Sequence, residues 1–126
     1  MDSMVKDLSR LISIPSVRSV ALPDKPFGEE VNNALLATLE LCKGYGFRVK
    51  NCNGYAGYAE IGEGNEMLGV LLHVDVVAVS GKWGYPPFNA TIEDGRLYGR
   101  GSIDDNGPTV TCIHALKEIL DSRIPL

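Results

Sequence analysis

Three observations predict an α/β fold for this sequence. Residues 2–14 and 29–45 carry apolar side chains at the three- and four-residue spacing of helices. From residue 47 to residue 98 the apolar pattern changes to alternation or to a continuous run, which is typical of strands. A third helical pattern follows Gly107-Pro108. We therefore expect helices packed on a mixed sheet.

The first helix is predicted over Asp2 to Ile14, and its end is set by Pro15, because the residue before a proline avoids the α region. The second is predicted over Glu29 to Tyr45, with Gly44 and Gly46 as its stop. The apolar faces of these two helices are Val5, Leu8, Leu11 and Ile12 in the first, and Val31, Leu35, Leu39 and Cys42 in the second.

Strands are expected in the middle of the chain. Residues 47–50 alternate and residues 55–61 resemble a strand, and the turn cluster at 62–65 then indicates a hairpin. The continuous apolar run Leu68 to Leu72 suits a strand that is covered on both faces. Asp94-Gly95 between short strand-like segments is a strong signal for a second, tight hairpin.

The last predicted helix begins near Gly107-Pro108, where a proline in the first turn is favourable. The sequence then closes on Ile124-Pro125-Leu126, which resembles the lead-in to another strand. The sheet is therefore expected to be unfinished, so that residues 1–126 form one portion of a larger domain.

Composition excludes several classes of partner. The formal net charge is -4 and the 12 basic residues are scattered, so no nucleic-acid surface is expected. No apolar stretch approaches the roughly 18 residues that a membrane-spanning helix needs. The start of the sequence lacks the basic and apolar blocks of a signal peptide. Three cysteines without a CxxC pair indicate neither a disulfide framework nor a zinc knuckle, and a cytoplasmic location is expected.

The motif His73-Val74-Asp75 directly follows the apolar run. Along an extended chain the side chains of His73 and Asp75 point to the same side. A carboxylate in that position can accept the second ring N–H of the histidine and raise the basicity of the nitrogen that binds a metal. The alternative is a histidine at a strand end beside a solvated aspartate.

A second motif runs from Gly99 to Pro108 and contains Asp104-Asp105. Adjacent carboxylates just before a helix can serve as an N-cap. They can also bridge metal ions, one as ligand and its neighbour as support. A loop and a hairpin separate His73 from Asp104, and they could return the chain to the same sheet edge. The two side chains would then make half a site for a dication.

Together these residues resemble the co-catalytic zinc peptidases that include aminoacylase, succinyl-diaminopimelate desuccinylase and carnosinase. The resemblance covers nearly the whole chain and is nearest to the bacterial dipeptidase V (Xaa-His dipeptidase) branch. It rests on several linked elements in order, which are His73-Val74-Asp75, Trp83, Pro87-Phe88, Asp94-Gly95, Gly99-Arg100-Gly101 and Asp104-Asp105.

The resemblance implies a role for each motif residue. His73 would bind one zinc ion, Asp104 would bridge two, and Asp75 would be the catalytic-site residue that orients His73. The Asp104–Asp105 peptide would be cis. A complete site in this family holds two zinc ions and uses a glutamate as general base.

The second half of the family's site is not found in this sequence. The only Glu-Glu pair is Glu29-Glu30, which is expected to open a helix, and the only other histidine is His114, expected on a helix face. We therefore expect the N-terminal segment of a zinc-dependent dipeptidase acting on dipeptides or small peptides, inactive as residues 1–126 alone. The alternatives are a family deacylase, desuccinylase or carboxypeptidase, and a non-catalytic remnant that serves as an interaction module. Self-association through an uncovered sheet edge is also expected.

Overall fold

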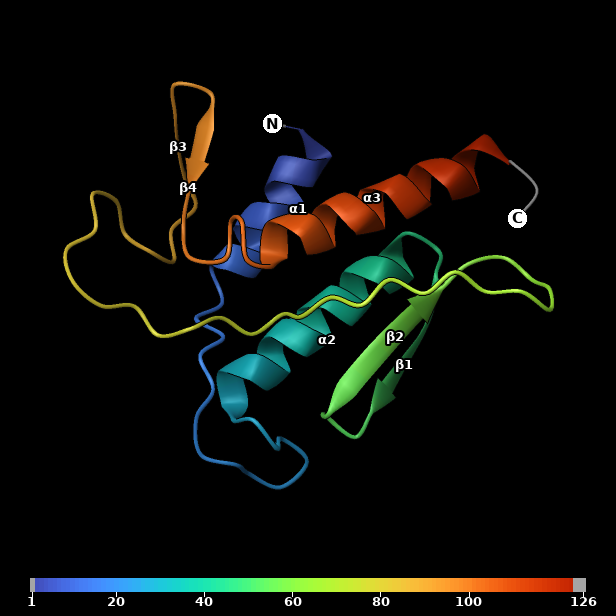
Figure 1. Cartoon of the computed structure of the whole chain (residues 1–126), viewed down its shortest axis with the longest axis horizontal. Helices are drawn as coiled ribbons and strands as arrows, with labels where there is room; N and C mark the ends of the chain where they lie inside the picture. The colour runs from blue at the N-terminus through green and yellow to red at the C-terminus, as the bar shows by residue number, and fades with distance from the viewer. Residues whose placement is uncertain (1, 124–126) are drawn as a thin grey trace.

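The computed structural model describes residues 2–123 and contains three helices and two β-hairpins (Figure 1). The predicted α/β class is confirmed. The elements in chain order are α1 (Ser3–Ile12), α2 (Glu29–Gly44), β1 (Arg48–Cys52), β2 (Ala56–Glu60), β3 (Thr91–Glu93), β4 (Arg96–Tyr98) and α3 (Asn106–Ser122).

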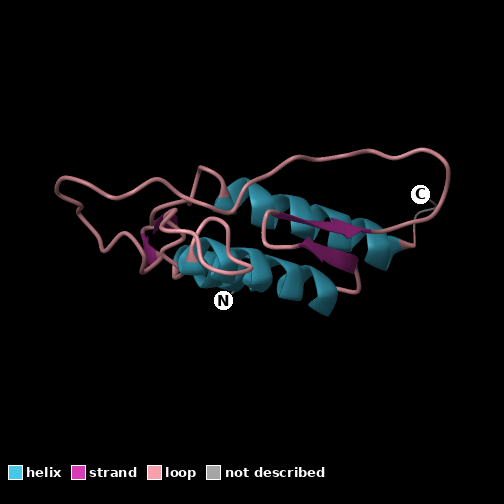
Figure 2. Ribbon diagram, turned by 90° about the horizontal axis from the view of Figure 1, so that it is seen from below, coloured by secondary structure: helices cyan, strands magenta, loops and turns pink. Residues whose placement is uncertain are grey.

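The helices form the centre of the molecule. Helix α1 packs against α3 and also contacts α2, and the β1–β2 hairpin covers another side of α2. The β3–β4 hairpin stands apart from β1–β2, and the two hairpins do not join into one sheet (Figures 1 and 2). None of the helices described is long and apolar enough to cross a membrane.

Local sequence signals explain where the helices begin. The Asp2 carboxylate caps α1 by accepting a hydrogen bond of 2.9 Å from the backbone N–H of Met4. Helix α2 follows Gly28, whose φ of 95° suits glycine, and it carries Glu29 and Glu30 in the first turn, where negative charge is favourable. Pro108 lies in the first turn of α3, as predicted.

One hairpin prediction is confirmed and the other is displaced. Asp94 and Gly95 have φ values of 50° and 73° and join β3 to β4, as the sequence indicates. The first hairpin turns at Asn53-Gly54 instead of at residues 62–65. Both turn residues have positive φ, and the Asn51 side chain accepts a hydrogen bond of 2.8 Å from the Gly54 N–H. That Asx-type contact identifies the true turn.

The strand predicted over Leu68 to Leu72 does not form. The segment is extended but belongs to neither sheet, and Leu68 and Leu71 are 91% and 98% exposed. A continuous apolar run becomes a buried strand only where other strands flank it. Each of the four strands described pairs within its own hairpin, so none remains to flank this run.

The core lies where the three helices meet. One cluster joins Leu11 of α1, Ala37 of α2 and Val110 of α3, and the other joins Leu41, Cys42, Phe47 and Ile113. Ile12 and Val110 are fully buried. On α2 the buried face contains Val31, Leu39 and Cys42 as predicted, whereas Leu35 is only half-buried. The shift brings Ala34, Ala37 and Leu41 into the interior.

A polar clasp formed by Asp7, Tyr45 and His114 joins the three helices. The Asp7 Oδ2 atom lies 2.7 Å from His114 Nε2 and accepts a hydrogen bond of 2.6 Å from the Tyr45 hydroxyl. The rings of Tyr45 and His114 meet edge to face with centroids 5.3 Å apart. His114 is thus a buried residue on the face of α3 that packs on Tyr45.

Breaking this clasp at Tyr45 should lower stability in a pH-dependent way. Burial first, and then the Asp7 carboxylate, raise the pKa of Tyr45 from 10.0 to about 12. The unfolded state therefore loses this proton first, and the contribution of Tyr45 is complete below pH 10 and lost between pH 10 and about 12. Tyr45→Phe removes the hydrogen bond and should cost about 1–2 kcal/mol at pH 7.

The free energy of unfolding of wild type and Tyr45→Phe, measured in urea from pH 7 to pH 12, checks this expectation. The difference between the two proteins should shrink as the pH rises through the interval above 10. A difference that stays constant across that interval would contradict the role given to the Tyr45 hydroxyl.

Candidate metal centre

The predicted site residues His73, Asp75 and Asp104 come together at one place. The His73 Nε2 atom lies 2.9 Å from Asp104 Oδ1, although the two residues are 31 positions apart in the chain. The other ring nitrogen, Nδ1, lies 3.3 Å from Asp75 Oδ1 and 3.1 Å from the Asp75 carbonyl oxygen. Asp75 thus lies beside His73 as the His-x-Asp spacing predicts, but the ring nitrogen makes its hydrogen bond with the carbonyl oxygen of Asp75 and not with the carboxylate.

The main chain around His73 is fixed from two sides. The Asp105 carboxylate accepts a hydrogen bond of 3.0 Å from the backbone N–H of His73. On the other side, Ser16 is fully buried, its hydroxyl donates to the Val74 carbonyl over 2.8 Å, and its own carbonyl accepts from the Val76 N–H over 3.0 Å. These bonds hold residues 73–76 in place without a neighbouring strand.

Asp104 and Asp105 have divided roles. The peptide bond between them is cis, as the resemblance implies. Asp105 stands at the N-cap position of α3, yet its side chain makes no capping hydrogen bond and binds the His73 N–H instead. The alternative interpretation of this carboxylate as a helix cap is therefore wrong. The Asp104 side chain remains 83% exposed and faces His73.

The turn before Asp104 requires glycine. Gly101 has a φ of 90°, and a Cβ atom there would lie 2.6 Å from Asn106 Nδ2 and 3.1 Å from a Val76 methyl group. Asn106 lies at the start of α3, and only 2% of its surface is exposed. Close packing of this turn on residues 76 and 106 sets the position of Asp104.

The His73 ring lies among acidic groups. Burial lowers the pKa of His73, but the Asp75 carbonyl and the carboxylates of Asp104, Asp105 and Asp75 together outweigh it, so that the pKa is raised. Both ring nitrogens face oxygen atoms, and in this arrangement the ring can donate two hydrogen bonds. The site therefore has a negative electrostatic potential, which favours the binding of a cation.

The donor chemistry fits a zinc ion in part. A histidine nitrogen and a carboxylate oxygen are both common zinc ligands, and here the two atoms face each other. Across residues 2–123, no group of three or more His, Cys, Asp or Glu side chains is arranged to hold a metal ion. The described residues thus offer two atoms of the kind that bind zinc, which is fewer than a complete site needs.

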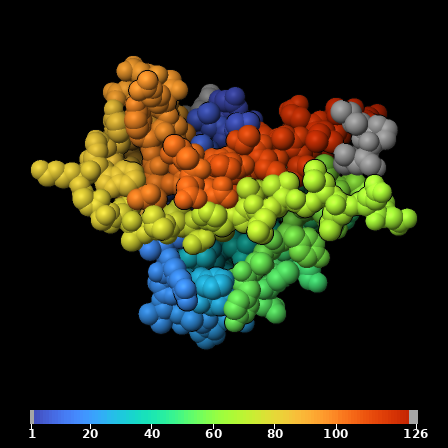
Figure 3. Space-filling view, in the orientation of Figure 1, coloured from blue at the N-terminus to red at the C-terminus, as the bar shows by residue number. Residues whose placement is uncertain are grey.

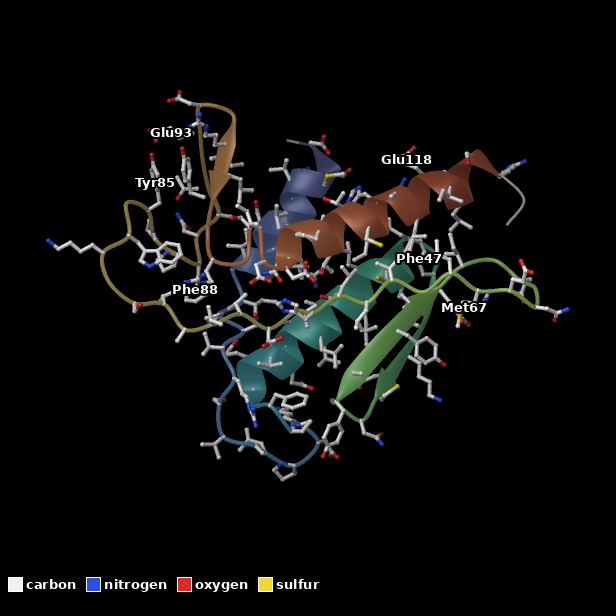
Figure 4. All side chains as sticks on the ribbon, in the orientation of Figure 1. Phe47, Met67, Tyr85, Phe88, Glu93 and Glu118 are labelled. Carbon is white, nitrogen blue, oxygen red and sulfur yellow. The ribbon has the colours of Figure 1, made fainter. Side chains whose placement is uncertain are left out.

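The loop from Trp83 to Phe88 packs on the residues that lead into the site. The Arg100 guanidinium lies 4.9 Å from the centre of the Trp83 ring. The backbone N–H of Arg100 donates a hydrogen bond of 2.6 Å to the Pro87 carbonyl. Tyr85 stacks on Tyr98 and donates a hydrogen bond to Glu93, and Figure 4 shows Tyr85 beside Glu93. The loop thus supports the turn at residues 99–101, which leads to Asp104.

Sequence reasoning missed two supporting residues. Ser16 directly follows Pro15, and no sequence pattern indicates that its hydroxyl reaches the carbonyl of Val74, 58 residues later. Thr109 places its hydroxyl 3.4 Å from the His73 carbonyl oxygen, and nothing in its sequence context indicates this contact. Both residues bind backbone carbonyls near His73. Neither has a titratable side chain, so a motif of titratable residues does not indicate them.

Comparison with known proteins supports the resemblance seen in the sequence. Residues 69–126 match the model of peptidase family M20/M25/M40, and this stretch contains His73, Asp75 and Asp104. The chain is 46% identical over 127 residues to the Bacillus subtilis (strain 168) protein named "Putative dipeptidase YtjP". The chain is thus similar to M20 peptidases in the stretch that carries these three residues.

Further relatives have similar names. A Staphylococcus haemolyticus (strain JCSC1435) protein named "Putative dipeptidase SH1171" is 37% identical over 123 residues. These alignments cover 99% and 96% of the chain but only 27% and 26% of the relatives. The chain therefore spans about a quarter of the length of the curated relatives it matches.

A solved structure shares the fold of the chain. The crystal structure of human carnosine dipeptidase 1 superposes with a TM-score of 0.67 at 22% sequence identity. The match covers 94% of the chain and 28% of that structure. The helices and hairpins described above thus have the fold of one portion of that structure.

Proposed function

We propose that residues 1–126 are the N-terminal portion of the catalytic domain of a zinc-dependent dipeptidase, and that this portion alone does not turn over substrate. The observation that carries the proposal is the 2.9 Å approach of His73 Nε2 to Asp104 Oδ1, with Asp75 behind the ring. The names of the relatives support dipeptides as the substrate class.

In this proposal each described residue has one task. His73 and Asp104 hold zinc, Asp104 being the residue that a second zinc ion would share, and Asp75 keeps Nε2 of His73 directed at the metal. Zinc in such a site supplies Lewis-acid activation of water for attack on a peptide carbonyl. Asp105 fixes the His73 backbone and so keeps the two ligands aligned.

The general base and the remaining ligands belong, in this proposal, to the part of the protein that extends beyond these 126 residues. Glu29 and Glu30 do not serve as the base, since both lie in the first turn of α2 and Glu29 pairs with Lys25 over 2.6 Å. Without a base to take the proton of the attacking water, the chain should bind zinc but not hydrolyse dipeptides.

A cytoplasmic location is part of the same proposal. Cys42, Cys52 and Cys112 are free thiols, which agrees with a reducing compartment. Burial is the chief reason that the pKa of Cys42 is raised to about 11, so this thiol stays protonated and unreactive at neutral pH.

Zinc titration of the 126-residue chain tests the site. Competition with a fluorescent zinc indicator should show one binding event, and Asp104→Asn should weaken it at least about tenfold, because a ligand oxygen loses its charge. Asp121→Asn is the matched control, because Asp121 is an exposed carboxylate on α3 that pairs with Lys117 and lies outside the site. It should change zinc affinity less than about twofold.

Two results would contradict the proposal. Equal loss of zinc affinity in the Asp104→Asn and Asp121→Asn proteins would show that zinc binds by general negative charge. The other result is chelator-sensitive hydrolysis of dipeptides by the purified chain, measured as the release of free amino acids. It would contradict the proposal that this portion alone does not turn over substrate.

A further inference from the structure

The end of helix α1 touches both of the segments that carry the proposed zinc ligands. Ile12, the last residue of the helix, lies against Gly99 in the turn that precedes α3. Ser16 follows in the loop after the helix and binds the main chain beside His73. Figure 1 shows this end of α1 next to the orange turn at the start of α3. Residues 12–16, the bracket, therefore contact both halves of the site.

The contact between the bracket and the His73 segment is a pair of hydrogen bonds. The Ser16 hydroxyl donates to the Val74 carbonyl over 2.8 Å, and the Ser16 carbonyl accepts from the Val76 N–H over 3.0 Å. In Figure 3 the blue chain that follows α1 lies directly below the yellow band that contains this segment. Ser16 is fully buried, so both bonds are shielded from water. Loss of the hydroxyl would leave the Val74 carbonyl without this donor and loosen the segment.

The contact between the bracket and the Asp104 side of the site is steric. A Cβ atom on Gly99 would lie 2.7 Å from a methyl carbon of Ile12, so the two residues are packed without a gap. Ile12 has no exposed surface that would let its side chain move aside. The turn continues from Gly99, whose carbonyl accepts from the Ser102 N–H over 3.3 Å. A shift of Ile12 would therefore reach Asp104 through this turn.

Helix α1 fixes the bracket to α3. The two helices share a buried core cluster, and Asp7 of α1 lies 2.7 Å from His114 of α3. Asp104 stands just before the first residue of α3. The bracket and Asp104 thus belong to one packed body. Within residues 2–123 no strand pairs with the His73 segment, so individual hydrogen bonds hold this segment against that body.

We propose that the bracket is a positioning element of the zinc site, which sets the separation between His73 and Asp104. The inference rests on the proposed function, since it concerns the affinity of the same site for zinc. Two ligands can share one ion only if they stay within about 0.5 Å of their productive geometry. Ser16 and Ile12 are not ligands. They are positioning residues that act on the two ligands through the main chain.

Zinc titration of Ser16→Ala tests the proposal. Competition with a fluorescent zinc indicator should show a dissociation constant raised about tenfold, because the His73 segment is no longer held in register with Asp104. Ser9→Ala is the matched control. The Ser9 hydroxyl donates to the Val5 carbonyl over 2.7 Å, so the same kind of bond is lost, but inside α1. This variant should change the zinc dissociation constant less than about twofold.

Ile12→Val tests the other half of the bracket. It removes one methylene group from the contact with Gly99 and should raise the zinc dissociation constant about threefold. Circular dichroism and urea unfolding establish that each variant is folded before zinc is added. If Ser16→Ala does not fold, unchanged zinc affinity in a folded Ile12→Val protein would overturn the proposal.

A second measurement needs no metal. In the zinc-free chain, Ser16→Ala should speed amide hydrogen exchange at His73 and Val76 at least about fivefold, whereas Ser9→Ala should leave both amides unchanged. A general loss of stability would speed exchange in the core of all three helices as well. Faster exchange confined to residues 73–76 therefore identifies positioning by the bracket.

The outcomes separate this inference from the proposed function. Zinc binding that depends on Asp104 but is unchanged in Ser16→Ala would overturn the bracket and leave the proposed function intact. A chain that binds no zinc, but in which Ser16→Ala frees residues 73–76, would overturn the proposed function and support the bracket. Equal losses of zinc affinity in Ser16→Ala and Ser9→Ala would overturn the bracket, because weaker docking of α1 would explain both.

Discussion

Gly107→Ala should destabilise the chain by about 3 kcal/mol, because the first turn of α3 leaves no room for a methyl group. A Cβ atom on Gly107 would lie 2.1 Å from the Ser102 carbonyl oxygen, which is backbone and cannot rotate away. The Gly107 N–H also donates to the Gly101 carbonyl over 3.2 Å, so the shift would reach the turn that positions Asp104. Urea unfolding followed by circular dichroism measures the loss.

Gly44→Ala is the matched control for this substitution. Gly44 is also a helical glycine, but no atom lies within 4 Å of the position that its Cβ would occupy. Alanine has the higher helix propensity, so this variant should be neutral or about 0.5 kcal/mol more stable. Equal effects of the two substitutions would show that helix propensity, and not the contact with Ser102, decides the result at residue 107.

Ile12→Ala should cost about 3 kcal/mol, through loss of buried apolar surface and creation of a cavity. Ile12 is fully buried at the end of α1 and lies against Gly99, where an added Cβ would come within 2.7 Å of its methyl group. The residue thus connects α1 with the turn that precedes the site. If the Ile12→Ala protein is too unstable to purify, Ile12→Val can be measured in its place, and a loss of about 1 kcal/mol in the free energy of unfolding is expected.

Leu36→Ala provides the comparison for Ile12→Ala. Leu36 lies on α2 with 47% of its surface exposed, so its truncation should cost less than about 1 kcal/mol. The two free energies of unfolding, measured in the same urea series, should differ by about 2 kcal/mol. A cost at Ile12 as small as that at Leu36 would contradict the assignment of Ile12 as a core residue.

Elements with strong local signals were predictable from the sequence. The three helices begin and end near the predicted residues because Asp2, Gly28 and Pro108 act within one turn of the chain. The Asp94-Gly95 hairpin is equally local. The segment 68–72 was not predictable, because whether an apolar run forms a buried strand depends on strands elsewhere.

The part of the site that follows from a short spacing along the chain was predictable from the sequence. His73 and Asp75 share one side of an extended chain at any location, and their contact follows from a spacing of two residues. The approach of Asp104 required the resemblance to a known family, since a loop and a hairpin intervene. The hydrogen bonds from Ser16 and Asp105 depend on tertiary placement, and the sequence carries no periodic sign of either.

The contact between Asp7 and His114 within the polar clasp has a consequence for the order of folding. Its two residues are separated by 107 positions, although both are nearly buried and 2.7 Å apart. As a ribosome synthesises the chain from its N-terminus, α1 emerges first, and its Asp7 carboxylate lacks the His114 partner until α3 has left the exit tunnel. The β1–β2 hairpin and α2 can pack on each other well before then. Helix α1 is therefore synthesised first but is among the last elements to complete its tertiary contacts. Nascent chains that stop before residue 114 should leave α1 open to proteolysis.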